Sequence, residues 1–474
     1  MENNKTTTGG PAQPNKMGVM PEGRLLFTMG VPLALSMLIQ ALYNIVDSVF
    51  VSYLGESALT AVTLAYPIFI LMISVAVGTG VGVNSLISRR LGAHRHAEAE
   101  RAASNGFVVL LVSSLVFVLF GIFGAKPFIQ AYTDVPETAE YGATYLSIIC
   151  TYCVGLFLQV FCERIMQSQG KNLYAMLMQL VGAIVNIVFD PILIFGLFGF
   201  PKLGIAGAAI ATVGGQFTAM FFSMFIILSK QNEVRVHLKG FRPDLPSIRG
   251  IYEVGFPTIV MQAIGTVMTL IMNAILISFT ETAVAVFGAY FRVQSVAFMP
   301  LFGLTNASLS IMAYNYGACN KKRIMRTLRL TVVVGLILMT IMTALFLLIP
   351  NQILSLFNAS EAMLEIGKSA FAIIPLGLVL ASVSICCSTV FQAIGKGSYS
   401  MYISLARQLV VLVPVAWLLA HFVGTVSAVW WAFPIAEVFS LIMSILLFVY
   451  VYNQRIRTLQ PSAAIPAPIP GLDL

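Results

Sequence analysis

A single spacing of 225 residues relates the second half of this chain to the first. Four short segments recur at that spacing: Gly30-Val-Pro32 as Gly255-Phe-Pro257, Glu56-Ser-Ala58 as Glu281-Thr-Ala283, Gly92-Ala93 as Gly317-Ala318, and Gly170-Lys171 as Gly395-Lys396. Repeated halves in a strongly apolar chain are typical of membrane transporters, in which the two halves move against each other around a site between them. The duplication therefore predicts two related lobes with a shared interface.

Apolar segments of membrane-spanning length fill both halves. Charged residues make up only 10% of the chain, against about 25% in soluble domains, and about 20 apolar residues are enough to cross a hydrocarbon core. The expected spans are residues 25–53, 58–88, 101–124, 138–166, 172–200 and 204–230 in the first half, and 249–279, 282–315, 326–349, 363–392, 397–424 and 425–453 in the second.

These segments predict an all-α integral membrane protein with about 12 transmembrane helices in two six-helix repeats. Because six is even, both repeats enter the membrane in the same direction, so the repeats are parallel and an axis along the membrane normal relates them. The expected organisation is a tail at 1–24, an N-lobe at 25–230, a linker at 231–248, a C-lobe at 249–453 and a tail at 454–474.

The distribution of basic residues predicts the topology. The chain carries a net charge of +8, and its Lys and Arg residues are concentrated in the tails and in alternate loops, with dense clusters at 89–101, 230–249 and 321–329. Cytoplasmic loops of membrane proteins carry such an excess. We therefore expect both termini to be cytoplasmic, and we attribute the basic excess to topology and not to a nucleic-acid partner.

Two aspartates lie inside spans of the first half, where a carboxylate is costly and is a functional candidate. Asp47 has no neutralising neighbour in sequence. Asn186 and Asp190 lie four residues apart and share a helix face, and Pro191 leaves the carbonyl oxygen of Ile187 without its helical donor. These oxygens would suit Na⁺ or a proton. The alternative interpretations are a structural hydrogen bond for Asp47 and a proline-kinked helix for the second pair.

The second half lacks this acidic group, since the positions equivalent to Asp47, Asn186 and Asp190 are Met272, Val411 and Val415. Its intramembrane charges are Arg407 and Glu437, for which we expect a structural ion pair, with Arg292 as an alternative partner. In the first half Arg164 follows Glu163 near a cytoplasmic span end. We expect this pair to extend its charged groups toward water.

The segments Gln40-Ala-Leu-Tyr-Asn-Ile-Val-Asp47, Leu54-Gly-Glu, Asn186-Ile-Val-Phe-Asp190-Pro191 and Gly207-Ala-Ala-Ile-Ala-Thr212 resemble the multidrug and toxic compound extrusion (MATE) family. The resemblance covers the whole hydrophobic chain and is closest to bacterial members with a coupling site in the N-terminal lobe. It implies a V-shaped bundle in the bacterial cytoplasmic membrane that exports cationic or amphipathic molecules in exchange for H⁺ or Na⁺.

Within that resemblance, Asp47, Asn186 and Asp190 correspond to the N-lobe cation or proton site, and Thr212 to a further ligand. Another branch of the family has an acidic site early in its seventh span, but here Pro257 to Gly265 contains no carboxylate. The resemblance implies no cofactor beyond the coupling ion, contacts with membrane lipids and a monomeric protein. The expected rigid-body motion is of residues 25–230 against 249–453.

Two other functions remain as alternatives. A lipid-linked saccharide flippase of the same superfamily would need several cationic side chains in its central cavity, whereas the first-half spans carry Asp47 and Asp190. A membrane-embedded enzyme such as a prenyltransferase would need paired Asp-rich metal motifs, and no nucleophile–base or metal-ligand pattern is present in the spans.

The predicted topology can be tested by labelling single cysteines in intact cells. An impermeant thiol reagent applied from outside should label Glu281→Cys and leave Gly240→Cys unmodified, because residue 240 lies in a basic cluster. Ready labelling at 240 without labelling at 281 would overturn the topology.

Overall fold

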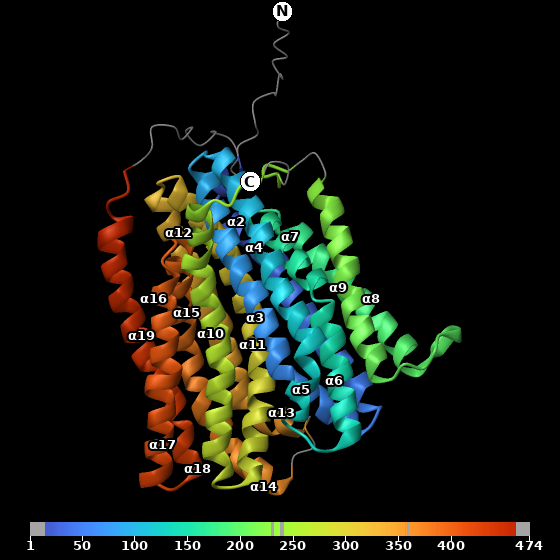
Figure 1. The fold of residues 1–474 in the computed structure, drawn as a ribbon. Helices are drawn as coiled ribbons and strands as arrows, with labels where there is room; N and C mark the ends of the chain where they lie inside the picture. Colours follow the sequence, from blue (N-terminus) through green and yellow to red (C-terminus); the bar gives the residue numbers. More distant parts are fainter. Residues whose placement is uncertain (1–14, 229–231, 238–240, 356, 358–359, 461–474) are drawn as a thin grey trace, which may run out of the picture.

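Helices form nearly all of the molecule. In the computed structural model the described residues are 15–228, 232–237, 241–355, 357 and 360–460. The first half contains α1 (Lys16–Val19), α2 (Glu22–Ser52), α3 (Glu56–Gly92), α4 (His96–Phe123), α5 (Ala125–Gln130), α6 (Pro136–Thr151), α7 (Val154–Ser168), α8 (Asn172–Phe195), η1 (Leu197–Gly199) and α9 (Ile205–Leu228). These helices run along one another as a bundle (Figure 1).

The second half repeats this order. It contains α10 (Leu245–Ile277), α11 (Glu281–Gly317), α12 (Lys321–Leu348), α13 (Pro350–Ser355), α14 (Glu361–Ile373), η2 (Ile374–Gly377), α15 (Leu378–Ala393), α16 (Gly397–Leu405), the π-helical turn η3 (Ala406–Leu412), α17 (Val413–Phe422), α18 (Val426–Trp430), α19 (Ala432–Val451) and η4 (Tyr452–Ile456).

The spacing of 225 residues also relates the helix ends of the two halves. The bounds of α3, α4 and α5, shifted by that spacing, coincide with those of α11, α12 and α13. The short helices α5 and α13 lie outside the predicted spans, so the repeat extends to elements that hydropathy alone did not indicate. His94 and Cys319, which are equivalent positions, both adopt a left-handed backbone conformation, with φ values of 57° and 56°.

The predicted all-α membrane fold is confirmed, with small changes at the boundaries. Eleven helices of the described chain are long and apolar enough to span a membrane, or 12 when the bent pair α6 and α7 is counted as one span. The predicted single span at 138–166 is therefore broken, with a bend of 44° between α6 and α7. The predicted linker is shorter than expected, because α10 begins at Leu245. Residue 240 lies outside the described residues.

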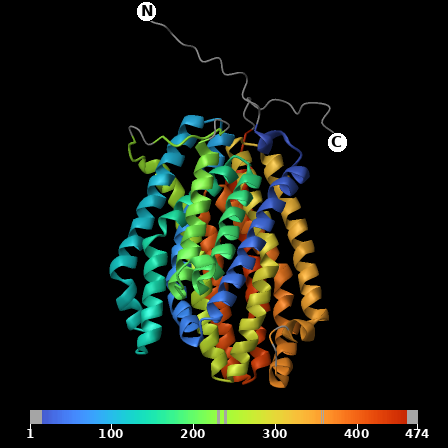
Figure 2. The same ribbon diagram turned by 90° about the vertical axis from the view of Figure 1, so that its right-hand side faces the viewer.

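The lobes pack against each other mainly through four helices. α2 lies against α11 and α3 lies against α10, while α3 and α11 also contact each other. α10 is the repeat partner of α2, and α11 is the repeat partner of α3. The contact of α2 with α11 is therefore equivalent to the contact of α10 with α3. Figure 1 shows α3 beside α10, and Figure 2, turned by 90°, shows α2 beside α11. The two parallel repeats are thus related by a twofold axis that passes between α3 and α11.

Glycines make this contact close enough for backbones to touch. A Cβ atom added to Gly92 would overlap the carbonyl oxygen of Tyr314, and one added to Gly317 would overlap the carbonyl oxygen of Arg89. Arg89 and Tyr314 are themselves equivalent positions. Small residues allow helices to approach in this way inside membranes. We call this α3–α11 contact around Gly92 and Gly317 the glycine seam.

The short helix α1 covers the seam at the end of the bundle where α2 begins. Met17 is fully buried, and its carbonyl oxygen accepts hydrogen bonds from Asn315 Nδ2 at 3.0 Å and Arg323 Nη2 at 3.3 Å in the C-lobe. Lys16 lies against Gly170 of the N-lobe. Burial, and then the charge of Lys171, lowers the pKa of Lys16. Part of the predicted tail 1–24 is therefore an ordered element that contacts both lobes.

The seam generates a prediction about conformation. Gly317→Ala should separate the α1 end of the lobes, because the new methyl group meets the rigid carbonyl of Arg89. Spin labels at His96→Cys on α4 and Lys322→Cys on α12 should report an added population at longer distance. Gly288→Ala is the matched control, since a Cβ there meets nothing within 4 Å. Superimposable distance distributions for the two alanine variants would contradict the assigned role of the seam.

Candidate functional site

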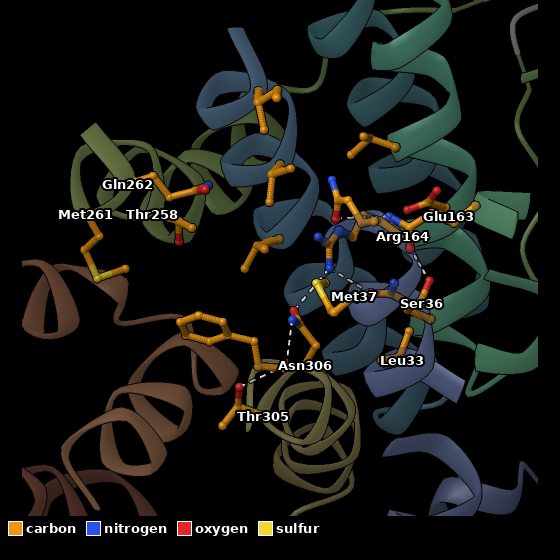
Figure 3. A pocket seen from close by; sticks show the side chains of 18 of the residues that line it. Leu33, Ser36, Met37, Glu163, Arg164, Thr258, Met261, Gln262, Thr305 and Asn306 are labelled. Carbon is orange, nitrogen blue, oxygen red and sulfur yellow. Dashed lines mark hydrogen bonds between the residues drawn. The ribbon is translucent and has the colours of Figure 1, made fainter. Parts of the chain in front are cut away.

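A cavity of about 540 Å³ lies between the lobes, lined by α2, α3, α7, α8 and α9 on one side and by α10, α11, α15, α16, η3 and α19 on the other. Figure 3 shows part of its wall, with Thr258 and Gln262 across the cavity from Glu163 and Arg164. Its volume lies in the range of small-molecule sites. Much of its polar lining consists of neutral amides: Gln40, Gln159, Gln167, Gln179, Gln216, Gln262, Gln392, Gln408, Asn186 and Asn306.

The structure brings together the N-lobe residues that the sequence singled out. Asn186 and Asp190 lie one turn apart on α8, and Thr212 lies on the adjacent α9. Asn186 Nδ2 donates to Asp190 Oδ1 and to Thr212 Oγ1, each at 3.4 Å. All three residues are buried, Asp190 completely. α8 continues through Pro191 to Phe195, so the proline does not end the helix.

Asp47 on α2 completes this group from a third helix. Its carboxyl group lies close enough to the Asp190 carboxyl group for the two to interact. Asp47 Oδ1 and Asp190 Oδ2 are buried and have no hydrogen-bond partner among the described residues. Two carboxylates in contact repel each other unless a proton or a cation lies between them. We call Asp47, Asp190, Asn186 and Thr212 the carboxyl cluster.

The two carboxyl groups of the carboxyl cluster lie behind the cavity wall, while its other two members form part of that wall. Tyr43, Asn186 and Thr212 line the cavity, whereas Asp47 and Asp190 do not. Tyr43 is close enough to interact electrostatically with both carboxyl groups of the cluster and also with Glu163. A thin polar layer therefore separates the carboxyl groups of Asp47 and Asp190 from the cavity.

The expected outward extension of Glu163 and Arg164 toward water is wrong. Their exposed fractions are 8% and 4%, and both line the cavity. Gln159 Nε2 donates to Glu163 Oε1 at 3.0 Å, and Arg164 Nη1 donates to Gln167 Oε1 at 2.8 Å. Polar residues at 159, 163 and 167 repeat every four positions and therefore share one face of an otherwise apolar helix. This sequence pattern could have indicated that the face lines a cavity.

Arg164 also connects the lobes. Its Nη1 donates to Asn306 Oδ1 of α11 at 3.2 Å, and Figure 3 shows this bond between the two lining side chains. Two more bonds join the lobes along α3, between the cavity and Gly92. Asn84 Nδ2 donates to Ser310 Oγ at 3.1 Å, and Ser85 Oγ donates to the Gln392 carbonyl oxygen at 2.6 Å. These bonds close the space between the cavity and the glycine seam.

The second-lobe charges form the expected ion pair. Arg407 Nη1 lies 2.6 Å from Glu437 Oε1, with side-chain exposures of 26% and 15%. Arg407 comes from the π-helical turn η3 and also lines the cavity. The alternative partner Arg292 is exposed on α11 and takes no part in this pair.

Comparison with known proteins gives consistent matches. The MatE family model matches residues 32–192 and 257–418, once in each half and together over more than half of the chain. The multidrug export protein MepA of Staphylococcus saprophyticus is 24% identical over 90% of this chain and 93% of its own length. A protein of Shewanella oneidensis described as an FAD transporter is 26% identical over 88% of this chain and 92% of its own length.

Solved structures show the same fold. One, described as the outward-facing conformation of a multidrug resistance MATE family transporter, matches with a TM-score of 0.89 at 25% identity and covers 95% of this chain and all of the other. Another, a transporter from Pyrococcus furiosus described as having a binding pocket of reverse polarity, matches with a TM-score of 0.88 at 25% identity, over 96% of this chain and all of the other.

The ion pair of the second lobe generates a stability prediction. Glu437→Gln leaves Arg407 charged without a counter-charge, which should lower the free energy of unfolding by roughly 2 kcal/mol. Thermal melting in detergent would measure this. The charge-free double variant Arg407→Leu with Glu437→Leu should recover most of the loss. Equal melting temperatures for wild type and Glu437→Gln would show that the pair has no stabilising role.

Proposed function

The chain belongs to the MatE family, and we propose that it is a secondary active antiporter that exports amphipathic small molecules, cationic ones among them, in exchange for H⁺ or Na⁺. Family membership makes it a multi-pass membrane transporter. The MepA relatives, which are named as multidrug export proteins, support small molecules as its cargo.

One observation carries the proposal: Asp47 and Asp190 meet directly behind the wall of the central cavity. Because burial and mutual repulsion disfavour two negative charges there, the pair needs a proton or Na⁺ in one state of the cycle. Loss of that ion would leave uncompensated charge next to Tyr43, Asn186 and Thr212, which face the substrate space. Ion binding to the two carboxyl groups and substrate binding in the cavity would then oppose each other, because Tyr43, Asn186 and Thr212 lie between the two sites.

Conversion between outward-open and inward-open forms would proceed by near-rigid motion of residues 25–230 against 249–453, with 231–248 as the connection. The repeat supports this motion, because a twofold pair of lobes can exchange contacts at one end of the bundle for contacts at the other. The glycine seam and the bond from Arg164 to Asn306 would have to open in that exchange. By the charge distribution, both termini would lie in the cytoplasm of a bacterial cell.

Charge balance in the cavity weighs against a lipid-linked saccharide flippase. A diphosphate would need several uncommitted cations. The cations along the described cavity wall are Arg164 and Arg407. Arg164 lies next to Glu163 in sequence and Arg407 is paired with Glu437, so a diphosphate would meet about as much negative charge as positive.

Neutralising either carboxylate should abolish ion-driven export while the protein remains folded. Asp47→Asn and Asp190→Asn are the test variants, and Asp134→Asn, on an exposed loop, is the matched control. Purified protein in liposomes would be given Na⁺ and pH gradients separately, with tetraphenylphosphonium as substrate. The gradient that drives wild-type transport identifies the ion. Normal ion-driven transport in both test variants at normal protein amounts would refute coupling through this pair.

A further inference from the structure

Five polar atoms on the cavity-lining residues are buried and have no hydrogen-bond partner among the described residues. They are Asn186 Oδ1, Gln216 Oε1, Gln262 Nε2, Arg164 Nε and Ser440 Oγ. The two amide oxygens are acceptors, the two nitrogens are donors, and the hydroxyl can act as either. Because a buried polar group without a partner costs about 1–3 kcal/mol, such atoms indicate where a bound molecule is expected to form hydrogen bonds.

These atoms come from both lobes and lie near the groups already described. Gln216 follows Thr212 of the carboxyl cluster by one turn on the same face of α9. Gln262 lies on α10, one turn after Thr258, and Figure 3 shows both across the cavity from Arg164. A molecule that bonded Gln216 and Gln262 together would connect the N-lobe to the C-lobe.

The chemistry of such a molecule follows from these partners. The unpaired Gln216 oxygen is an acceptor and the unpaired Gln262 nitrogen is a donor, so a molecule that bonds both must carry a donor and an acceptor. A bare lipophilic cation has neither, and it would also approach the positive charge of Arg164. An amide or imide edge on a planar ring supplies both.

We propose that the cavity recognises planar heteroaromatic molecules that carry an amide-type edge, and that Gln216 and Gln262 form hydrogen bonds with the donor and the acceptor of that edge. This inference rests on the proposed export function and narrows its substrate class. The ring would occupy the apolar part of the wall, which includes Phe69, Phe302 and Met261.

The test uses two ligands that differ by one donor. Aminonaphthalimide presents an N–H between two carbonyl groups, and its N-methyl derivative lacks that donor but keeps the ring and the fluorescence. Binding to the purified full-length protein would be followed by that fluorescence. Wild type should bind the N–H compound about tenfold more tightly than the N-methyl compound, because the methylated edge leaves a buried acceptor unpaired.

Gln216→Leu and Gln262→Leu should each reduce this tenfold preference to about twofold or less. Gln352→Leu makes the same change on an exposed residue of α13 and should leave it intact. Equal wild-type affinities for the two compounds, or an unchanged preference in both cavity variants, would overturn the inference. The wild-type comparison alone decides the matter if a variant fails to fold.

Transport of tetraphenylphosphonium separates this inference from the function it rests on. Gradient-driven transport of that cation without any preference for the N–H compound would refute the amide-edge inference and leave the antiporter proposal standing. Absence of gradient-driven transport for both tetraphenylphosphonium and aminonaphthalimide would refute the antiporter proposal as well.

Discussion

The close packing of α3 against α11 fixes the arrangement of everything else in this molecule. At Gly92 and Gly317 the two backbones touch, so the repeat axis must pass between these helices. The neighbouring contacts of α2 with α11 and of α3 with α10 follow by symmetry. The cavity lies farther along the same interface, bounded by the bond from Arg164 to Asn306. A side chain larger than hydrogen at either glycine would separate the lobes at the end that α1 covers.

The scaffold is symmetric, but the chemistry it carries is not. In the first lobe α2 and α8 bring Asp47 and Asp190 together, whereas the equivalent positions of the second lobe are Met272 and Val415, both of which pack in the apolar core. The second lobe carries instead the ion pair of Arg407 and Glu437. This division suits a transporter in which one lobe binds the driving ion and the other supplies a stable opposing wall, with substrate in contact with both.

Much of this could be predicted from sequence, and the exceptions have physical causes. Apolar segments located the spans because hydropathy is a local property of the sequence, and the spacing of 225 residues related the spans of one half to those of the other. Asp47, Asn186 and Asp190 stood out because charge inside an apolar span is rare. Glu163 and Arg164 were misplaced because their span bends after Thr151, which turns α7 and its polar face into the cavity.

Other features depend on contacts that sequence spacing does not reveal. The helix α1 has only four residues, too few for a periodic pattern, and its position depends on Met17 fitting between the lobes. The proximity of Asp47 to Asp190 depends on how α2 packs against α8, which their positions in the sequence do not show. The unpaired atoms of Gln216 and Gln262 depend on the packing of α9 and α10 around the cavity.

The central claim is that substrate displaces an ion held by Asp47 and Asp190. Proton release on substrate binding tests it most directly, measured with a pH dye in weakly buffered, Na⁺-free solution. Linkage between the two sites predicts release of about one proton for each tetraphenylphosphonium bound by wild type, and loss of that release when both residues are changed to Asn. Equal proton release from wild type and from the double variant would contradict the account.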